Sequence, residues 1–214
     1  MKNLMHHHWF DIGVIFAVLV GIGLLMHSHD VSALSVLLWM SLITLFAHQF
    51  EEYRFPGWFP GMLNVVLFRS NDPMRYPLNT SSSLAVNVGV GWVSYLAAAI
   101  WGTSYLWLAI ATLSISVGNC FLHLILIPLR GCRPYNPGMI TSLLLFLPIT
   151  VWFFVITAGS ITMIDWVLGI AVGLVLNVLG VVGLIRLMAN PNTKNVFLPR
   201  QVTPAMKYAT TVHK

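Results

Sequence analysis

Six long apolar stretches run through this chain, and they limit what it can fold into more than any other feature. They cover residues 10–28, 33–51, 83–102, 105–128, 139–158 and 162–188. Each is close to the roughly 20 residues that an α-helix needs to cross a bilayer. A chain inside a bilayer must satisfy its own backbone hydrogen bonds, so such stretches form helices. The sequence therefore predicts an all-α, polytopic membrane helix bundle with six transmembrane helices over residues 1–188, followed by a cytoplasmic tail over 189–214.

The composition argues against an ordinary soluble domain. Of the 214 residues, 57% are hydrophobic and only 8% are charged, whereas a soluble domain carries roughly 25% charged residues. A helix in the core of a soluble protein would also show a polar stripe, and these stretches are apolar most of the way round. The chain is thus predicted to be an integral membrane protein.

The lysines and arginines predict how the helices are oriented. A cytoplasmic N-terminus puts all 11 Lys and Arg residues on the cytoplasmic side, and the opposite loops then carry none. The cytoplasmic segments are 1–9, 52–82, 129–138 and 189–214, with Arg186 at the end of the last helix. Cytoplasmic loops are enriched in positive charge, so we expect both termini in the cytoplasm and the protein in the cytoplasmic (inner) membrane. This orientation and attraction to anionic lipid account for the net charge of +5 without a nucleic-acid partner.

The only two glutamates of the chain, Glu51 and Glu52, follow His48 by three and four positions at the end of the second apolar stretch. Residues at these spacings share a helix face, so His48 lies over both carboxylates. A carboxylate close to hydrocarbon is costly and marks a functional candidate. The segment predicts a patch of one imidazole and two carboxylates that can hold a metal ion or share a proton. The competing interpretation is that the glutamates lie at the membrane interface and pair with Arg54 in water.

Other polar residues are predicted to lie at the same depth, near the cytoplasmic ends of their helices. Asn87 belongs to the third stretch, and Asn119 and His123 share a face of the fourth. Tyr135 and Asn136 follow in the next cytoplasmic loop. A lone Asn or His in a helix bundle is often only an interhelical hydrogen-bond partner. Their gathering on one side of the membrane nevertheless predicts a site.

The candidate residues of this site fall into two groups. The predicted catalytic residues are His48, Glu51, Glu52 and His123, and the predicted substrate-binding residues are Asn87, Asn119, Tyr135 and Asn136. The four catalytic candidates are also the predicted metal ligands, because imidazole and carboxylate groups suit zinc, iron or manganese. With so few carboxylates, one divalent metal is expected rather than a di-iron site. Asn119 and Asn136 would then orient ligands or substrate.

Four functions are compatible with such a site. The first is a membrane metalloenzyme that acts on a lipid or isoprenoid-like substrate at the cytoplasmic leaflet. The second is a metal-free acid/base isomerase, cyclase or hydratase, because two adjacent carboxylates in low dielectric cannot both ionise cheaply. The third is a small proton- or cation-coupled transporter, and the fourth is a scaffold or lipid-binding protein with no turnover. The expected partners are membrane lipid and a hydrophobic small molecule. The sequence leaves open the oligomeric state and any role of His6, His7 and His8.

The motif resembles that of a known family. His48-Gln49-Phe50-Glu51-Glu52 fits the His-x-x-Glu-Glu pattern of the HXXEE family of bacterial integral membrane proteins. The pair Asn119 and His123, and the run from Tyr135 to Gly138, are similar to its later blocks, so the resemblance covers about residues 40–140. The family has no settled function. The resemblance therefore implies a membrane setting and a motif, and the reaction has to be inferred from the residues.

Overall fold

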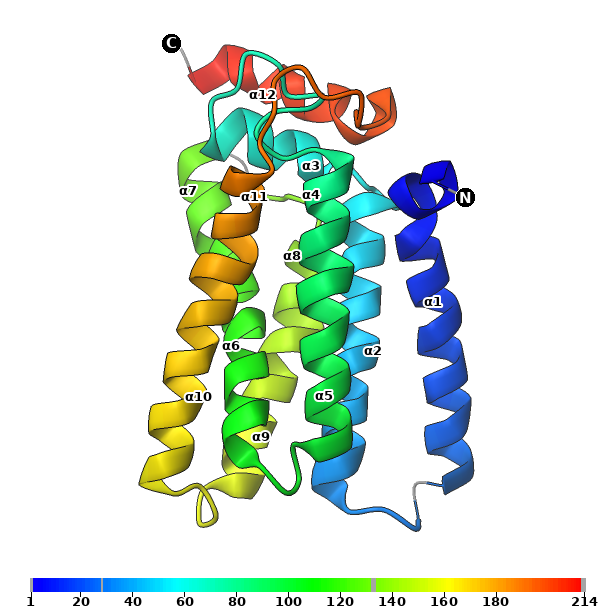
Figure 1. Ribbon diagram of the computed structural model, residues 1–214, viewed down its shortest axis with the longest axis vertical. Helices are drawn as coiled ribbons and strands as arrows, with labels where there is room; N and C mark the ends of the chain where they lie inside the picture. Colours follow the sequence, from blue (N-terminus) through cyan, green and yellow to red (C-terminus); the bar gives the residue numbers. More distant parts are fainter. Residues whose placement is uncertain (1, 28, 132–133, 213–214) are drawn as a thin grey trace.

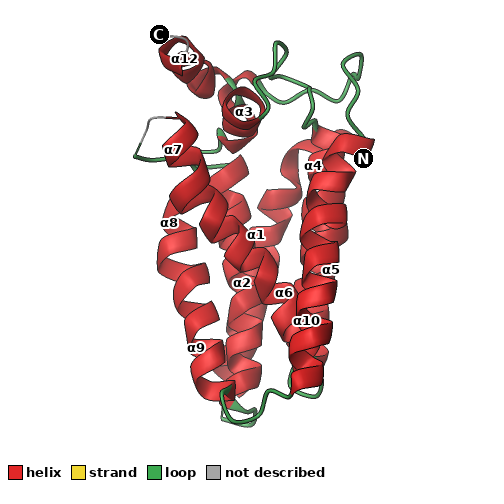
Figure 2. Ribbon diagram, turned by 90° about the vertical axis from the view of Figure 1, so that its left-hand side faces the viewer, coloured by secondary structure: helices red, strands yellow, loops and turns green. Residues whose placement is uncertain are grey.

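The computed structural model describes residues 2–27, 29–131 and 134–212, which form an elongated helix bundle (Figures 1 and 2). Six of the helices are long and apolar enough to cross a membrane, and the described residues contain no strand. The predicted all-α, polytopic membrane fold is confirmed. Arg133 and Lys214, which contribute to the predicted orientation, lie outside the described residues.

The first two spanning helices are continuous, and the other four each contain a π-helical segment. The continuous helices are α1 (Lys2–His27) and α2 (Ala33–Tyr53). The interrupted ones are α4–η2–α5 (Thr80–Leu84, Ala85–Trp92, Val93–Trp101), α6–η3–α7 (Leu106–Phe121, Leu122–Leu126, Ile127–Gly131), α8–η4–α9 (Met139–Thr141, Ser142–Phe146, Leu147–Thr157) and α10–η5–α11 (Met163–Val175, Leu176–Gly183, Leu184–Leu187). The shorter elements are α3 (Phe59–Met62), the π-helical η1 (Leu63–Leu67), the 3₁₀ turn η6 (Pro199–Gln201) and α12 (Thr203–Val212). Since π-helical turns are frequent at functional sites, their positions bear on function.

Polar residues at the loop ends start the helices where the apolar stretches begin. Asn79 and Ser82 form a reciprocal cap at the start of α4, and Thr162 and Asp165 form another at the start of α10. Such caps satisfy backbone N–H groups that the first turn of a helix leaves unpaired. The apolar residues that follow then extend each helix across the membrane.

Small residues allow α10 to pack closely along α6. A Cβ atom added at Gly169 would lie 2.6 Å from Ile110 Cγ2, and one added at Gly173 would lie 2.5 Å from Ser114 Oγ. Asn177 adds a hydrogen bond of 3.0 Å from its Nδ2 to Ser114 Oγ. Close backbone approach through small residues and interhelical hydrogen bonds are the usual means of helix association in membranes. The sixth spanning helix is therefore held firmly against the fourth.

Gly169→Leu is expected to lower the melting temperature by several degrees, because the new side chain has no room between α10 and α6. Overpacking of this kind costs about 1–3 kcal/mol. Gly21→Leu is the matched control, since a Cβ added at Gly21 would meet nothing within 4 Å. Thermal unfolding of both variants in the same detergent, followed by circular dichroism, measures the difference. Equal melting temperatures would contradict the close contact between these helices.

One end of the bundle, called the site end below, is the end at which α1 begins and across which α12 lies (Figures 1 and 2). It is covered by α3–η1 and by the C-terminal segment. A Cβ atom added at Gly61 of α3 would lie 2.6 Å from Val202 Cα. Gln201 Nε2 donates a hydrogen bond of 3.0 Å to Tyr53 O, at the end of α2. The residues after the last spanning helix thus pack back onto the membrane domain.

Aromatic residues hold α1 to the site end of α2. The ring centroids of Trp9 and Tyr53 are 4.9 Å apart, and those of Phe10 and Tyr53 are 6.1 Å apart. All three side chains are buried, as is Met62 of α3. The side-chain core is therefore well packed around the last turns of α2, which carry the His-x-x-Glu-Glu motif.

Candidate functional site

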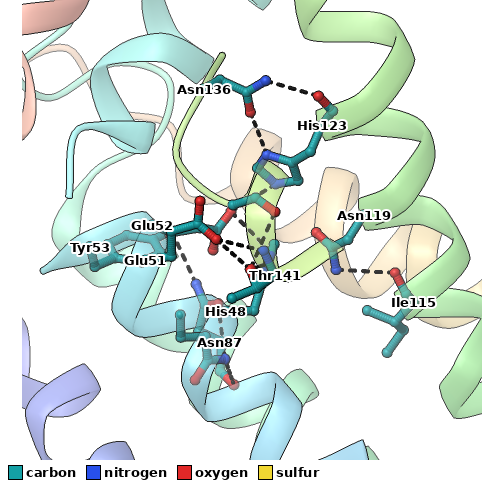
Figure 3. Close-up of polar contacts among 12 residues, drawn as sticks. His48, Glu51, Glu52, Tyr53, Asn87, Ile115, Asn119, His123, Asn136 and Thr141 are labelled. Carbon is teal, nitrogen blue, oxygen red and sulfur yellow. Dashed lines mark hydrogen bonds and ion pairs between the residues drawn. The ribbon is translucent and has the colours of Figure 1, made fainter. Parts of the chain in front are cut away.

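The candidate site lies at the site end, where α2 faces η3 (Figure 3). His48 and Glu52 project from the last two turns of α2, and His123 projects from η3. His48 is 1% exposed, His123 is 0% exposed and Glu52 is 4% exposed. Because burial removes these groups from water, each polar atom needs a partner within the protein or a bound ligand.

The two imidazoles point at the same carboxylate oxygen. Glu52 Oε1 lies 3.2 Å from His123 Nε2 and 3.5 Å from His48 Nε2. The two rings stand almost perpendicular, at 86°, with their centroids 4.9 Å apart. One ligand atom of each residue lies within 4.8 Å of the other two, which is close enough for all three to bind one metal ion. The structure therefore brings His48, Glu52 and His123 together from two helices.

The hydrogen bonds of His48 determine which of its ring nitrogens carries the proton. His48 Nδ1 lies 2.8 Å from Thr141 Oγ1, and the same hydroxyl lies 2.6 Å from Glu51 Oε2 (Figure 3). An ionised carboxylate only accepts hydrogen bonds, so the single hydroxyl proton of Thr141 goes to Glu51. The hydroxyl then accepts from His48 Nδ1. In the neutral ring, Nε2 is left with a lone pair directed at Glu52.

The same reasoning applies to His123. Its Nδ1 lies 2.6 Å from Asn136 Oδ1, while Asn136 Nδ2 donates a hydrogen bond of 2.9 Å to His123 O. The amide oxygen of Asn136 is thus the acceptor, and His123 Nδ1 is the donor. Nε2 of the neutral ring again carries a lone pair. Hydrogen bonds of this kind on the far nitrogen are typical of histidines that bind metals.

Three hydrogen-bond acceptors consequently face one another in a buried place. They are Nε2 of His48, Nε2 of His123 and Oε1 of Glu52, and His48 Nε2 has no hydrogen-bond partner among the described residues. Lone pairs in low dielectric repel one another unless a cation or a proton lies between them. The cluster is therefore built to take up positive charge.

Glu51 contacts different partners from Glu52, although the two are neighbours in the chain. Its carboxylate accepts hydrogen bonds from Ile140 N (3.2 Å), Thr141 N (2.9 Å), Thr141 Oγ1 (2.6 Å) and Tyr135 OH (3.2 Å). The two backbone groups belong to the first turn of the fifth spanning helix, where negative charge is favourable. Burial and the Glu51 carboxylate raise the pKa of Tyr135 above its ordinary value, so its hydroxyl remains a donor. Glu51 thereby ties α2 to the start of the fifth helix.

The remaining predicted site residues divide between the cluster and a neighbouring cavity. Tyr135 and Asn136 contact Glu51 and His123 respectively. Asn87 and Asn119 form their hydrogen bonds outside the cluster, but both line a cavity beside it. Asn119 Nδ2 donates to Ile115 O of its own helix, at 3.1 Å.

The cavity has a volume of about 260 Å³, and His48 and Glu52 form part of its wall. The rest of the wall is mostly apolar and comes from several helices that are distant in sequence. Four of the five π-helical segments contribute to it, namely η1, η2, η3 and η5. This matches the frequent association of π-helical turns with functional sites.

Two residues at the site were missed from the sequence. Thr141 lies 93 positions from His48, and no spacing rule connects them. Gln49, an unspecified position of the motif, accepts from Trp92 Nε1 at 2.8 Å and donates to Asn87 Oδ1 at 3.1 Å. The only signal for Thr141 is its place in the first turn of an apolar helix, where a hydroxyl can meet a neighbouring polar group.

These features define a polytopic helical membrane protein with a buried His/Glu cluster at one end of the bundle. A family model described as "protein of unknown function with HXXEE motif" matches residues 39–153, and the chain belongs to that family. The matched range is just over half of the chain, and it contains both histidines of the cluster, both glutamates, Asn136 and Thr141. No curated protein and no solved structure matches the chain.

Proposed function

We propose that the protein is a metal-dependent membrane enzyme in which His48, Glu52 and His123 bind one divalent metal ion. The observation that supports this most strongly is the proximity of three buried acceptors, Nε2 of His48, Nε2 of His123 and Oε1 of Glu52, with Nδ1 of both imidazoles already used as a donor. Such an arrangement is costly without a positive charge. A metal ion satisfies all three atoms at once.

The ligand set suits a catalytic metal rather than a structural one. Two imidazoles and a carboxylate are typical ligands for zinc, iron or manganese. Structural zinc sites usually have four protein ligands, whereas catalytic sites with three leave a position open for water or substrate. When bound, such a metal would polarise a substrate oxygen or activate a water molecule. His48 and Glu52 also line the mostly apolar cavity, so the proposed substrate is a hydrophobic molecule such as a lipid.

The other residues have supporting roles in this proposal. Thr141 and Asn136 hold the two imidazoles in the tautomer that a metal requires. Glu51 orients Thr141 through a 2.6 Å hydrogen bond, and is not itself one of the proposed ligands. Outer-shell groups of this kind commonly contribute 10- to 100-fold in metal affinity.

A metal-free acid/base enzyme is the second candidate, and one observation favours it. A proton between Glu52 and either imidazole would also relieve the repulsion among the three acceptors, since Glu52 Oε1 lies within 3.5 Å of both Nε2 atoms. The buried cluster could then transfer that proton to or from a substrate. Activity that survives complete removal of metal by a chelator would favour this candidate over the metalloenzyme.

We infer that the site end faces the cytoplasm. The basic residues Arg54, Arg69, Arg75, Arg130 and Arg186 belong to loops and helix ends on that side of the bundle. Positive charge near helix ends is enriched on the cytoplasmic side of membranes. A reporter fused to the C-terminus should stay inaccessible to protease added outside intact cells, and its digestion there would contradict this orientation.

Comparison of membrane lipids tests the proposed enzyme function. Cells that produce the wild type, and cells that produce equal amounts of His48→Ala, are analysed by mass spectrometry of extracted lipids. We expect at least one apolar compound to be depleted, and a related product to accumulate, only with the wild type. Identical lipid profiles would count against an enzyme that acts on membrane lipid.

Thr141→Val is expected to weaken metal binding by about 10- to 100-fold, because it leaves the Nδ1 proton of His48 without an acceptor. Thr141→Ser keeps the hydroxyl and should bind metal almost as the wild type does. Competition with a chelator of known zinc affinity measures the dissociation constants of both variants. Equal affinity of Thr141→Val and wild type would show that the hydroxyl does not orient a ligand.

A further inference from the structure

We propose that the cavity beside the cluster binds one hydrocarbon chain of the substrate, and that the substrate's head group is small and carries a hydroxyl. This inference rests on the proposed function, because it places the head group at His48, Glu52 and His123. It adds the chemical class of the substrate, which the ligand set alone does not give.

The size and lining of the cavity indicate a single chain. Its volume of about 260 Å³ is just below the usual range of roughly 300–1,000 Å³ for small-molecule sites. The side chains lining it away from the cluster are mainly Leu, Val and Ile, for example Leu45, Leu63 and Val90. The cavity is too small for both chains of a phospholipid, and its walls offer one chain an apolar environment.

Most polar groups in the cavity wall already have partners. Gln49 is bonded to Asn87 and Trp92, and Asn87 Nδ2 donates to Tyr53 OH at 3.2 Å. Asn119 is different: its Nδ2 donates to Ile115 O, while no described residue donates to its Oδ1. Asn119 is half-buried and lines the cavity, so its Oδ1 can still accept a hydrogen bond there. A ligand hydroxyl would supply the missing donor.

The wall also indicates how a chain reaches the cavity. Leu122 and Leu126 of η3 and Val182 of η5 all line it, and Val182 is 50% exposed on the lateral surface of the bundle. In a membrane that surface faces lipid. The geometry points to lateral access from the bilayer between η3 and η5.

Glycines on opposite sides of η2 provide a matched test of this site. Gly91 lines the cavity, and a Cβ added there would lie 3.5 Å from Gln49 Nε2 and 3.6 Å from Leu45 Cδ2, which is ordinary contact. A leucine at this position therefore projects into the cavity without displacing the backbone. Gly89 belongs to the same segment, and a Cβ added there would meet nothing within 4 Å. Gly91→Leu should fill the cavity, and Gly89→Leu should not.

The experiment is photo-crosslinking of purified, zinc-loaded full-length protein with dodecanol that carries a diazirine in its chain. Peptide mass spectrometry should find the label on Leu63, Leu122 or Leu126, which line the cavity. We expect labelling to fall by about tenfold or more in Gly91→Leu, and to be unchanged in Gly89→Leu. Unlabelled dodecanol should compete, and dodecane, which has no hydroxyl, should compete more weakly.

The outcomes distinguish this inference from the proposed function. Labelling that is confined to lipid-facing residues such as Leu19, or that Gly91→Leu leaves unchanged, would overturn the chain site even if zinc binds. Equal competition by dodecane would overturn the hydroxyl head group. Labelling of the cavity in a protein that binds no metal would support the chain site and would contradict the metalloenzyme.

Discussion

His123→Ala is expected to abolish metal binding at the cluster. The substitution removes one of three ligands and leaves a gap in a buried site, and the loss should exceed the 10- to 100-fold effect typical of outer-shell changes. Protein purified in zinc and then dialysed against a weak chelator should carry a single zinc ion per wild-type chain and almost none per variant chain. Elemental analysis by plasma mass spectrometry measures this directly.

His29→Ala is the control for this experiment. His29 is an exposed histidine in the loop between α1 and α2, at the opposite end of the bundle. Its removal should leave the zinc content unchanged. If His123→Ala retained its zinc with unchanged affinity, the cluster would not be the metal site.

Glu52→Gln should separate metal binding from folding. The amide removes a negative ligand, so zinc affinity should fall by more than about 100-fold. Its N–H groups can donate to Nε2 of His48 or His123, which satisfies lone pairs that face a carboxylate in the wild type. The metal-free variant should therefore melt at the same temperature as the metal-free wild type, or at a higher one. Zinc titration and thermal unfolding of the two metal-free proteins test both parts.

Glu51→Gln should lower the melting temperature and keep the zinc, which is the reverse of the result expected for Glu52→Gln. The two substitutions therefore serve as controls for each other. All four hydrogen bonds at Glu51 come from donors, so an amide N–H would face another N–H or O–H group. A lost or reversed hydrogen bond to a buried charged group costs about 1.5–3 kcal/mol. Glu51→Gln should melt at a lower temperature but still bind one zinc ion. Loss of zinc from Glu51→Gln, with retention in Glu52→Gln, would contradict the assignment of the two carboxylates.

The bundle was predictable because bilayer thickness dictates helix length. The apolar stretches alone indicate six spanning helices, and the structure has six helices of suitable length among its described residues. The π-helical segments were not predictable, since they depend on packing between helices rather than on local propensity. The packing of the C-terminal segment onto α3 at the site end was missed. Gly61 and Val202 meet across 141 positions of the chain, and no periodicity connects them.

The site was predictable where helix geometry applied. His48 and Glu52 are four residues apart, which places them on one face, and the depth of His123 suggested that it could meet them. It was not predictable that Glu52 would contact the histidines while Glu51 would contact Thr141. Consecutive residues on a helix point about 100° apart, so Glu51 turns toward Thr141 while Glu52 turns toward His123. Which carboxylate meets which partner depends on the position of the fifth helix.

X-ray absorption spectroscopy of the zinc-loaded wild type tests the central claim most directly, because it reports the atoms around the metal. The geometry predicts two imidazole nitrogens at about 2.0–2.1 Å and a carboxylate oxygen at about 2.0–2.2 Å. His48→Ala treated in the same way should lose the imidazole signal, because removal of one of three ligands abolishes metal binding at the cluster. A spectrum of hydrated zinc, of zinc bound to sulfur, or one that His48→Ala leaves unchanged would contradict a metal centre formed by His48, Glu52 and His123.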